Sequence, residues 1–147
     1  GGFRYTPGSD FSGGDSFTYR AGDGTGASDE ATVQIAVEPV NDSPRFTRGP
    51  DQSASASSEL IAVENWATNI TAGPNEADQS LQFLVEVQSG GELFASAPAI
   101  ALNGTLTYDP AAPGTATVVV RLQDDGGTAN DGRDTSDPVT VTFTFGP

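Results

Sequence analysis

The clearest periodic signal in the chain is a strict alternation over positions 31–37. Val33, Ile35 and Val37 fall on one side of an extended segment, and the positions between them are polar or small. Such alternation predicts a half-buried β-strand. Further strands are expected where short apolar runs lie between Gly, Pro, Asn and Asp, over 53–57, 60–64, 67–72, 81–88, 99–102, 105–108, 115–123 and 138–145. Because no long stretch combines a helical period with helix caps, the pattern predicts an all-β fold.

Two parts of the chain repeat the same order of strands and turns. A short strand with an aromatic residue before a proline occurs at 2–7 and at 104–110, and an Arg-containing strand ending in an Asp-Gly turn occurs at 17–24 and 118–126. The alternating strand closes both series. The offset is roughly 100 residues, the size of an immunoglobulin-like (Ig-like) antiparallel β-sandwich repeat.

We therefore expect residues 46–147 to form one complete β-sandwich repeat. Residues 1–45 are expected to be the C-terminal half of a preceding repeat, with three strands. Three strands cannot close a two-sheet sandwich, so one apolar face needs cover. Three alternatives remain open: the segment is a piece cut through a repeat, another chain donates the missing strands, or the small sheet folds by itself.

The charge of the chain narrows its partners. Its 147 residues include 20 acidic and 6 basic residues, which gives a net charge of −14. Such a field repels nucleic acid and anionic lipid and attracts divalent cations. No apolar run approaches the length of about 18 residues needed to span a membrane, so neither nucleic-acid binding nor membrane insertion is expected.

Composition also removes most catalytic chemistry. The chain has no Cys and no His, and its six basic residues are all Arg. A Ser-His-Asp triad, a Cys-His pair, a Schiff-base lysine and an ordinary zinc site therefore cannot be built. Only carboxylate chemistry remains, and no spacing singles out a pair of carboxylates flanking a groove. We expect that the chain is not an enzyme.

The segment after the strand at 31–37 is rich in oxygen ligands. Glu38, Asn41 and Asp42 offer hard oxygens of the kind that Ca²⁺ prefers, and Pro39 and Pro44 restrict the backbone around them. The alternative is that Asn41 and Asp42 only form an Asx turn before the proline.

A calcium ion takes six to eight oxygens, so further loops must supply ligands. From the second unit these ligands are expected to come from the loop Asn75-Glu76-Ala77-Asp78, with Asp78 as the candidate, and from the turn 124–127, with Asp124 and Asp125 as candidates. From the first unit, Asp10 or Asp23 is a candidate.

Three other features have simpler interpretations. The acidic loop 124–137 lacks the ligand spacing of an EF-hand and is equally well interpreted as a solvated hairpin loop. The sequence Gly-Asp-Gly-Thr-Gly at 22–26 lacks a lysine and a following helix, so it is interpreted as a turn and not as a phosphate-binding loop. Trp66 could be a sugar platform, but its position before an alternating strand favours the core.

Several of these segments together resemble a known family. Tyr5-Thr6-Pro7, the run 11–19, Asp23-Gly24 and the linker 39–44 are similar to the cadherin-like and Ig-like tandem repeats of large, calcium-dependent bacterial surface adhesins. The second unit resembles a different repeat type of the same proteins, on the residues 81–83, 93–94, 98–100, 104–108 and 124–128.

The resemblance implies calcium at the joint between repeats. Val63-Glu64-Asn65 resembles the cadherin glutamate motif, which implies that Glu64 is a ligand for the joint following residue 147. The segment 108–111 stands where cadherins carry Asp-Arg-Glu and supplies one carboxylate where two are usual. The resemblance to cadherins therefore does not imply how many calcium ions bind at the joint.

Together these features predict a non-enzymatic structural segment of an extracellular, cell-surface adhesin or filament, acting as a calcium-stiffened spacer. Its expected partners are neighbouring repeats of the same protein or identical subunits. Two alternatives are a polymerising subunit assembled by strand complementation, and a carbohydrate-binding accessory module.

Overall fold

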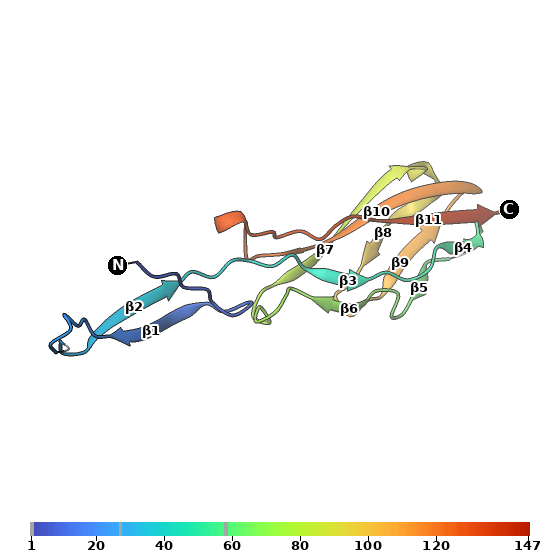
Figure 1. Ribbon diagram of the computed structural model, residues 1–147. Coiled ribbons are helices and arrows are strands. Elements are labelled where there is room, and N and C mark those ends of the chain that lie inside the picture. The colour runs from blue at the N-terminus through green and yellow to red at the C-terminus, as the bar shows by residue number, and fades with distance from the viewer. Residues whose placement is uncertain (1, 27, 58) are drawn as a thin grey trace. The chain divides into compact units, whose positions relative to one another are not determined.

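The computed structural model of the chain describes residues 2–26, 28–57 and 59–147. Over these residues, regular structure consists of β-strands and two short 3₁₀ turns, without an α-helix, which confirms the all-β prediction. The chain divides into two compact units, Gly1–Val40 and Asn41–Pro147. Figure 1 shows the strands of each unit, which we describe separately.

The first unit contains one antiparallel pair, β1 (Gly13–Tyr19) and β2 (Ala31–Val37). Phe17 lies opposite Val33, and side chains on that face of β2 are half-buried while those on the other face are exposed. The alternation at 31–37 therefore forms the predicted half-buried strand.

The segment 2–7 is not a strand, which corrects the prediction of three strands in this unit. Its aromatic residues nevertheless contact the hairpin. Phe3 packs edge-on against Phe17 with ring centroids 4.8 Å apart, and the Tyr5 hydroxyl donates to Asp15 Oδ2 at 2.7 Å. Side-chain contacts, and not a backbone ladder, hold this segment on the hairpin.

One layer of the second unit is a four-stranded sheet in the order β4-β11-β10-β7. Its strands are β4 (Gln52–Ser55), β7 (Leu81–Ser89), β10 (Gly114–Asp124) and β11 (Val139–Gly146). β10 pairs antiparallel with both of its neighbours, whereas β4 runs parallel to β11.

The other layer consists of a three-stranded sheet in the order β5-β9-β8 and a two-stranded pair, β3-β6. Its strands are β3 (Arg45–Thr47), β5 (Ile61–Val63), β6 (Thr68–Thr71), β8 (Phe94–Ile100) and β9 (Leu106–Pro110). The 3₁₀ turn η1 (Gly91–Leu93) leads into β8, and η2 (Ala129–Asp131) lies between β10 and β11.

An aromatic core joins the two layers. Tyr108 of β9 packs edge-on against Phe143 of β11, with ring centroids 5.0 Å apart, and Phe94 of β8 packs against both Phe143 and Phe145. On β10 every second residue from Ala116 to Asp124 is buried, so one face of this strand lines the core. The arrangement is a β-sandwich.

The chain enters the second unit at one end of β10 and leaves it at the other. Gly114, at the start of β10, pairs with Phe145 near the carboxyl end, while Asp124, at its end, is hydrogen-bonded to Asn41. A strand of this length spans roughly 33 Å. Tension applied to the two ends of this unit therefore acts nearly along its strands.

Two strands differ from the sequence expectation. The short β3 lies in a segment where no strand was predicted, and β8 begins at Phe94 although its strand was expected over 99–102. The register of β8 with β9 shifts twice, and its alternation is correspondingly weak. Its early start is therefore hard to recognise from the period alone.

Residues 41–45 belong to the second unit, whereas the sequence pattern placed the boundary between 45 and 46. Ser43 Oγ donates to the Thr135 carbonyl at 2.9 Å, the Arg133 backbone N–H donates to the Asn41 carbonyl at 3.1 Å, and Pro44 is buried. These contacts attach the segment to the sandwich before β3 begins.

Candidate functional site

The amino end of the second unit brings together three segments that are distant in sequence. They are the entering segment at 41–42, the loop 75–80 before β7, and the turn 124–127 after β10. The antiparallel register places Leu81, the first residue of β7, opposite Asp124, the last residue of β10. The loop before β7 and the turn after β10 must therefore meet at this end. We call these residues the end cluster: Asn41, Asp42, Glu76, Gln79, Ser80, Asp124 and Asp125.

Asn41 is the centre of the end cluster. Its Nδ2 donates to Asp124 Oδ1 and to the Arg133 carbonyl, both at 2.9 Å, and its Oδ1 accepts from Gln79 Nε2 at 2.7 Å. The two acceptors fix the orientation of the Asn41 amide, because its oxygen would be repelled by them. Gln79 must then present its amino group to Asn41 and direct its own oxygen elsewhere.

Close packing around Asn41 depends on glycine. A Cβ atom added at Gly126 would overlap Asn41 Oδ1, and one added at Gly132 would lie 3.1 Å from the Asn41 Cβ. The turn 124–127 and the loop that contains η2 thus approach Asn41 with their backbones.

Glu76 binds the next residue of the entering segment. The Asp42 backbone N–H donates to Glu76 Oε1 at 3.0 Å, and Gly73 leaves room for the carboxylate, since a Cβ there would overlap Glu76 Oε2. Asp125 closes the loop from the other side, where its Oδ1 accepts from the Ser80 N–H at 2.8 Å. Ser80, Leu81, Gln82, Gln123, Asp124 and Asp125 line a shallow pocket beside these contacts.

Three buried oxygens of the end cluster accept no hydrogen bond from any described residue: Glu76 Oε2, Gln79 Oε1 and Asp124 Oδ2. Asp124 is only 5% exposed, and its other oxygen already accepts from Asn41 and from the Gly126 N–H at 2.9 Å. The three ion pairs among the described residues, Arg20–Glu30, Arg48–Asp51 and Arg133–Asp137, include neither acidic residue of this group. Buried oxygens without a donor are costly unless a cation or another ligand binds them.

The acidic side chains of the end cluster are fewer than the sequence suggested. Among the residues that the structure describes, no three acidic side chains come together as a metal-binding group. The buried oxygens belong instead to two carboxylates and one amide, a mixture that is compatible with Ca²⁺ but poor in charge.

The structure brings four of the predicted ligands into this end: Asn41, Asp42, Asp124 and Asp125. Asp78 lies in the same loop but is exposed, and Glu64 is an exposed residue directly after β5. Asp10 and Asp23 belong to the first unit.

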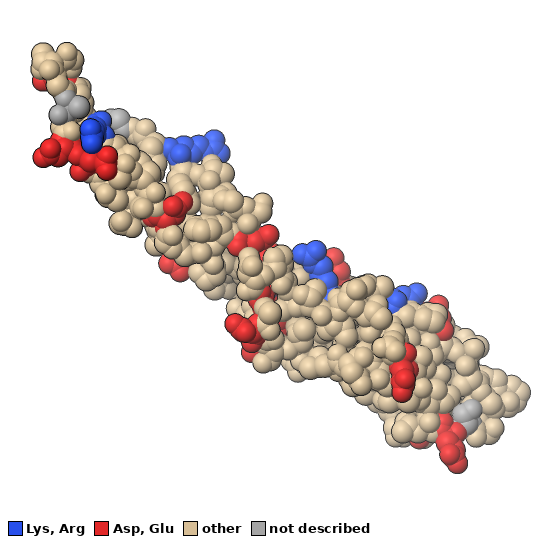
Figure 2. All heavy atoms as spheres, turned by 90° about the horizontal axis from the view of Figure 1, so that it is seen from below, with Lys and Arg blue, Asp and Glu red and all other residues tan. Residues whose placement is uncertain are grey.

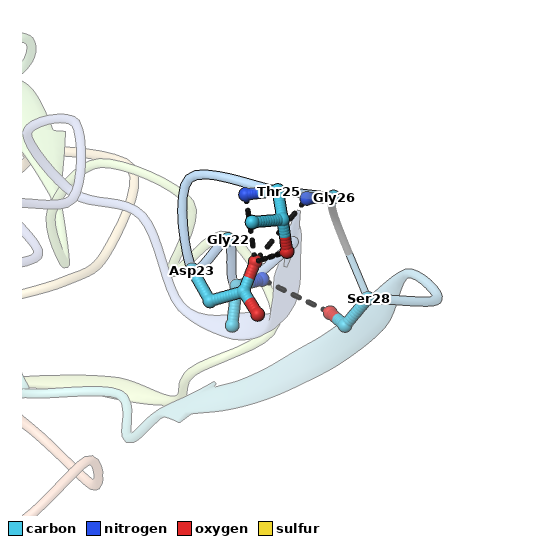
Figure 3. A pocket seen from close by; sticks show the side chains of 6 residues that line it. Gly22, Asp23, Thr25, Gly26 and Ser28 are labelled. Carbon is cyan, nitrogen blue, oxygen red and sulfur yellow. Dashed lines mark hydrogen bonds between the residues drawn. The ribbon is translucent and has the colours of Figure 1, made fainter.

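Asp23 holds its own turn together. Its Oδ1 accepts from the Thr25 hydroxyl at 2.7 Å and from the backbone N–H groups of Thr25 and Gly26 (Figure 3). The Thr25 hydroxyl, followed by these N–H groups, lowers the pKa of the Asp23 carboxyl. The segment 22–26 is therefore the turn that the sequence predicted.

Glu76 lies in the loop 75–78 that the sequence predicted to supply ligands, although Asp78 was the residue named from it, and Gln79 lies just outside that loop. Asp78 is the more obvious residue of the loop, yet Glu76 and Gln79 are the ones whose side chains turn inward. Their position could have indicated this role, because both residues lie a few positions before Leu81, the first residue of β7, which pairs with Asp124.

Trp66 is not available as a sugar platform. It is 2% exposed and its Nε1 donates to the Pro50 carbonyl at 2.9 Å, so the prediction of a core tryptophan is confirmed. Among the charged side chains on the surface, acidic ones outnumber basic ones, and Figure 2 shows scattered carboxylates with fewer arginines on an otherwise uncharged surface. In the described part of the chain, no helix has the length and apolarity to cross a membrane.

Comparison with known proteins identifies the fold. Residues 1–36 match the family model of the bacterial Ig domain. No curated protein matches the chain in sequence. Among solved structures, the chain is similar to human protocadherin-24 EC1-2 (form II), with a TM-score of 0.58 and 12% identity. The match covers 90% of this chain and 65% of that one, so the chain spans about two thirds of its length. At this identity the similarity shows the fold alone, which is that of cadherin-like and Ig-like β-sandwich repeats.

Proposed function

We propose that the chain is a non-catalytic structural segment of an extracellular bacterial surface protein, acting as a spacer in a series of repeats. The similarity of residues 1–36 to bacterial Ig domains and the cadherin-like fold support this role. The elongated path through the second unit, in at one end of β10 and out at the other, suits a repeat whose neighbours follow in line.

We further propose that Ca²⁺ binds the end cluster. One observation carries this: three buried oxygens at this end, on Glu76, Gln79 and Asp124, have no donor among the described residues. All three are acceptors that a hard cation would satisfy. Glu76, Gln79 and Asp124 would hold the ion, with backbone carbonyls or water completing its coordination.

Calcium would act on the entering segment through these residues. Glu76 and Asp124 are the partners of Asp42 and Asn41, so neutralising the two carboxylates would strengthen the attachment of residues 41 and 42 to the sandwich. A firmly attached entry segment leaves less free chain between this unit and residues before it. In this way calcium would stiffen the spacer.

Thermal unfolding tests the calcium proposal. Calcium at about 100 times its Kd should raise the free energy of unfolding by about 2.7 kcal/mol. For a domain of this size that corresponds to a rise of order 10 °C in Tm. Glu76→Gln and Asp124→Asn should reduce the rise, whereas Glu92→Gln, an exposed residue of η1, should not. An equal Tm of the wild-type chain in chelator and in millimolar calcium would exclude the calcium site and leave the spacer role standing.

A second candidate function is a polymerising subunit completed by strands of another chain. The first unit favours it, because its only regular structure among the described residues is the two-stranded pair β1-β2, and Phe3 and Tyr19 are 64% and 53% exposed. An isolated pair of strands is marginally stable in water. Sedimentation should then show concentration-dependent association, with residues 1–45 protected from proteolysis in the assembled form. A strict monomer with a protease-sensitive first unit would contradict this candidate.

A further inference from the structure

The amino-terminal strand of the second unit changes layers at residues 48–51. It pairs with β6 as β3 and then with β11 as β4, so these four residues form a crossover between the two layers. Both strand segments are short, with three and four residues. Backbone ladders of this length hold a strand weakly, and the crossover has contacts of its own.

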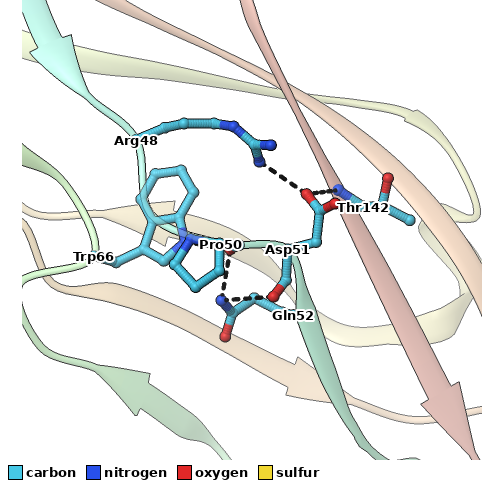
Figure 4. A network of polar contacts seen from close by, with 6 residues as sticks. All are labelled: Arg48, Pro50, Asp51, Gln52, Trp66 and Thr142. Carbon is cyan, nitrogen blue, oxygen red and sulfur yellow. Dashed lines mark hydrogen bonds and ion pairs between the residues drawn. The ribbon is translucent and has the colours of Figure 1, made fainter.

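Side chains attach the crossover to both layers. The Trp66 indole Nε1 donates to the Pro50 carbonyl at 2.9 Å, and Gly49 lies so close to Trp66 that an added Cβ would be 2.5 Å from its ring. On the other side, Asp51 Oδ1 accepts from Arg48 Nη1 at 2.8 Å and from the Thr142 backbone N–H at 3.1 Å (Figure 4).

The bond between Asp51 and Thr142 extends the ladder of β4 and β11. In that parallel pair Gln52 lies opposite Phe143, so Asp51 and Thr142 stand one position earlier on each strand. The Asp51 carboxylate thus takes the place of one further rung, in a charge-assisted form that is stronger than a neutral hydrogen bond. At the other end, the Ala56 N–H donates to the Gly146 carbonyl at 2.8 Å.

Because β4 and β11 are parallel, tension on the ends of the unit loads this strand pair in shear. Tension on the two ends of the unit pulls β4 toward the amino end and β11 toward the carboxyl end. The strands would slide past each other along their axes, which loads all rungs of the ladder at once. A peeled pair would instead lose its rungs one after another.

We propose that the crossover 48–51 is a mechanical latch, in which the Asp51 carboxylate holds the entering strand on β11 against shear. The biological need for such a latch rests on the proposed spacer role, because a spacer between a surface and a bound target is stretched along its length. The latch itself is a property of the second unit.

Single-molecule pulling of the full chain through its two termini tests the latch. Asp51→Ala removes both the ion pair with Arg48 and the bond from the Thr142 N–H. Because an exposed ion pair contributes little, the loss is roughly that of one charge-assisted hydrogen bond, and at constant force the unfolding rate of the second unit should rise about tenfold. The matched control is Asp137→Ala, which removes an exposed Arg–Asp pair of nearly the same length, 2.9 Å, outside the crossover. Its unfolding rate should equal that of the wild type.

A second pulling direction separates a latch from general destabilisation. The chain has no cysteine, so a single Leu102→Cys substitution in the exposed turn between β8 and β9 provides a unique handle. Tension between residues 102 and 147 bypasses the crossover, and Asp51→Ala should then change the unfolding rate less than twofold. Equal effects in both directions, or no effect in the first, would overturn the latch. Should Asp51→Ala fail to fold, Asp51→Asn, which keeps a neutral acceptor for the Thr142 N–H, should raise the terminal-pulling rate by a smaller factor, and an unchanged rate would count against the latch. Neither result bears on calcium binding, which the Tm titration decides independently.

Discussion

At the scale of single residues, Asn41 shows how a neutral amide can organise an acidic site. It donates to Asp124 and to the Arg133 carbonyl while it accepts from Gln79. Only an amide side chain can make all three of these hydrogen bonds. A carboxylate has no donor and cannot make two of these bonds. The residue therefore lowers the number of charges at the end cluster while keeping its segments together.

This role gives the prediction for Asn41→Asp. The new carboxylate oxygen would stand about 3 Å from Asp124 Oδ1, where like charges repel. In chelator we expect the free energy of unfolding to fall by about 1–3 kcal/mol. Calcium should restore more stability in this variant than in the wild type, since it would neutralise one more carboxylate. Denaturant unfolding with and without calcium measures both quantities.

Asn103→Asp is the matched control. Asn103 is exposed, and its Oδ1 accepts from the Thr105 N–H at 3.0 Å, a bond that a carboxylate also makes. Its free energy of unfolding should change by less than about 0.5 kcal/mol. A similar loss in both variants would show that added negative charge, and not the geometry at Asn41, causes the effect.

At the scale of elements, the period of the sequence predicted those strands whose two faces differ. β2, β7, β10 and β11 alternate cleanly in burial, and their expected ranges lie within a residue or so of the observed ones. β3 and β8 were missed or misplaced because their register is interrupted, so neither presents a regular period. Segment 2–7 has the composition of a strand but contacts its hairpin through side chains instead.

The end cluster was predictable in location but not in membership. The linker at 41–42 and the turn at 124–127 are recognisable as oxygen-rich, and their meeting follows from an antiparallel sandwich. Which side chain of the loop before β7 turns inward depends on its backbone path. A Cβ at Gly73 would overlap Glu76 Oε2, so a glycine at this position admits the inward Glu76 side chain, whereas Asp78 remains exposed. Counting acidic residues cannot reveal such a choice.

At the scale of the whole molecule, charge is the dominant property. With 20 acidic and 6 basic residues, the chain carries more repulsion than its three described ion pairs can offset. Surface pairs of this kind each contribute little at equilibrium. Mild acidification from neutral pH should therefore relieve repulsion, as should salt, before the loss of specific carboxylate contacts reverses the trend at lower pH.

At low pH, the contacts of the carboxylates determine whether stability rises or falls with pH. The Arg48 guanidinium, followed by the Thr142 N–H, lowers the pKa of Asp51 below that of an unfolded aspartate. The unfolded chain then takes up this proton at a higher pH than the folded one, so the stabilising contribution is present above pH 4 or so and is lost as the pH falls further.

Trp66, the single tryptophan, is buried in the second unit, so its fluorescence reports the unfolding of that unit. We expect the Tm followed by its fluorescence to fall steeply below about pH 4. Asp51→Asn, which cannot titrate, should begin lower and fall less steeply over that range. Parallel limbs for the two proteins would place the acid sensitivity in other carboxylates and remove Asp51 from the pH dependence of the fold.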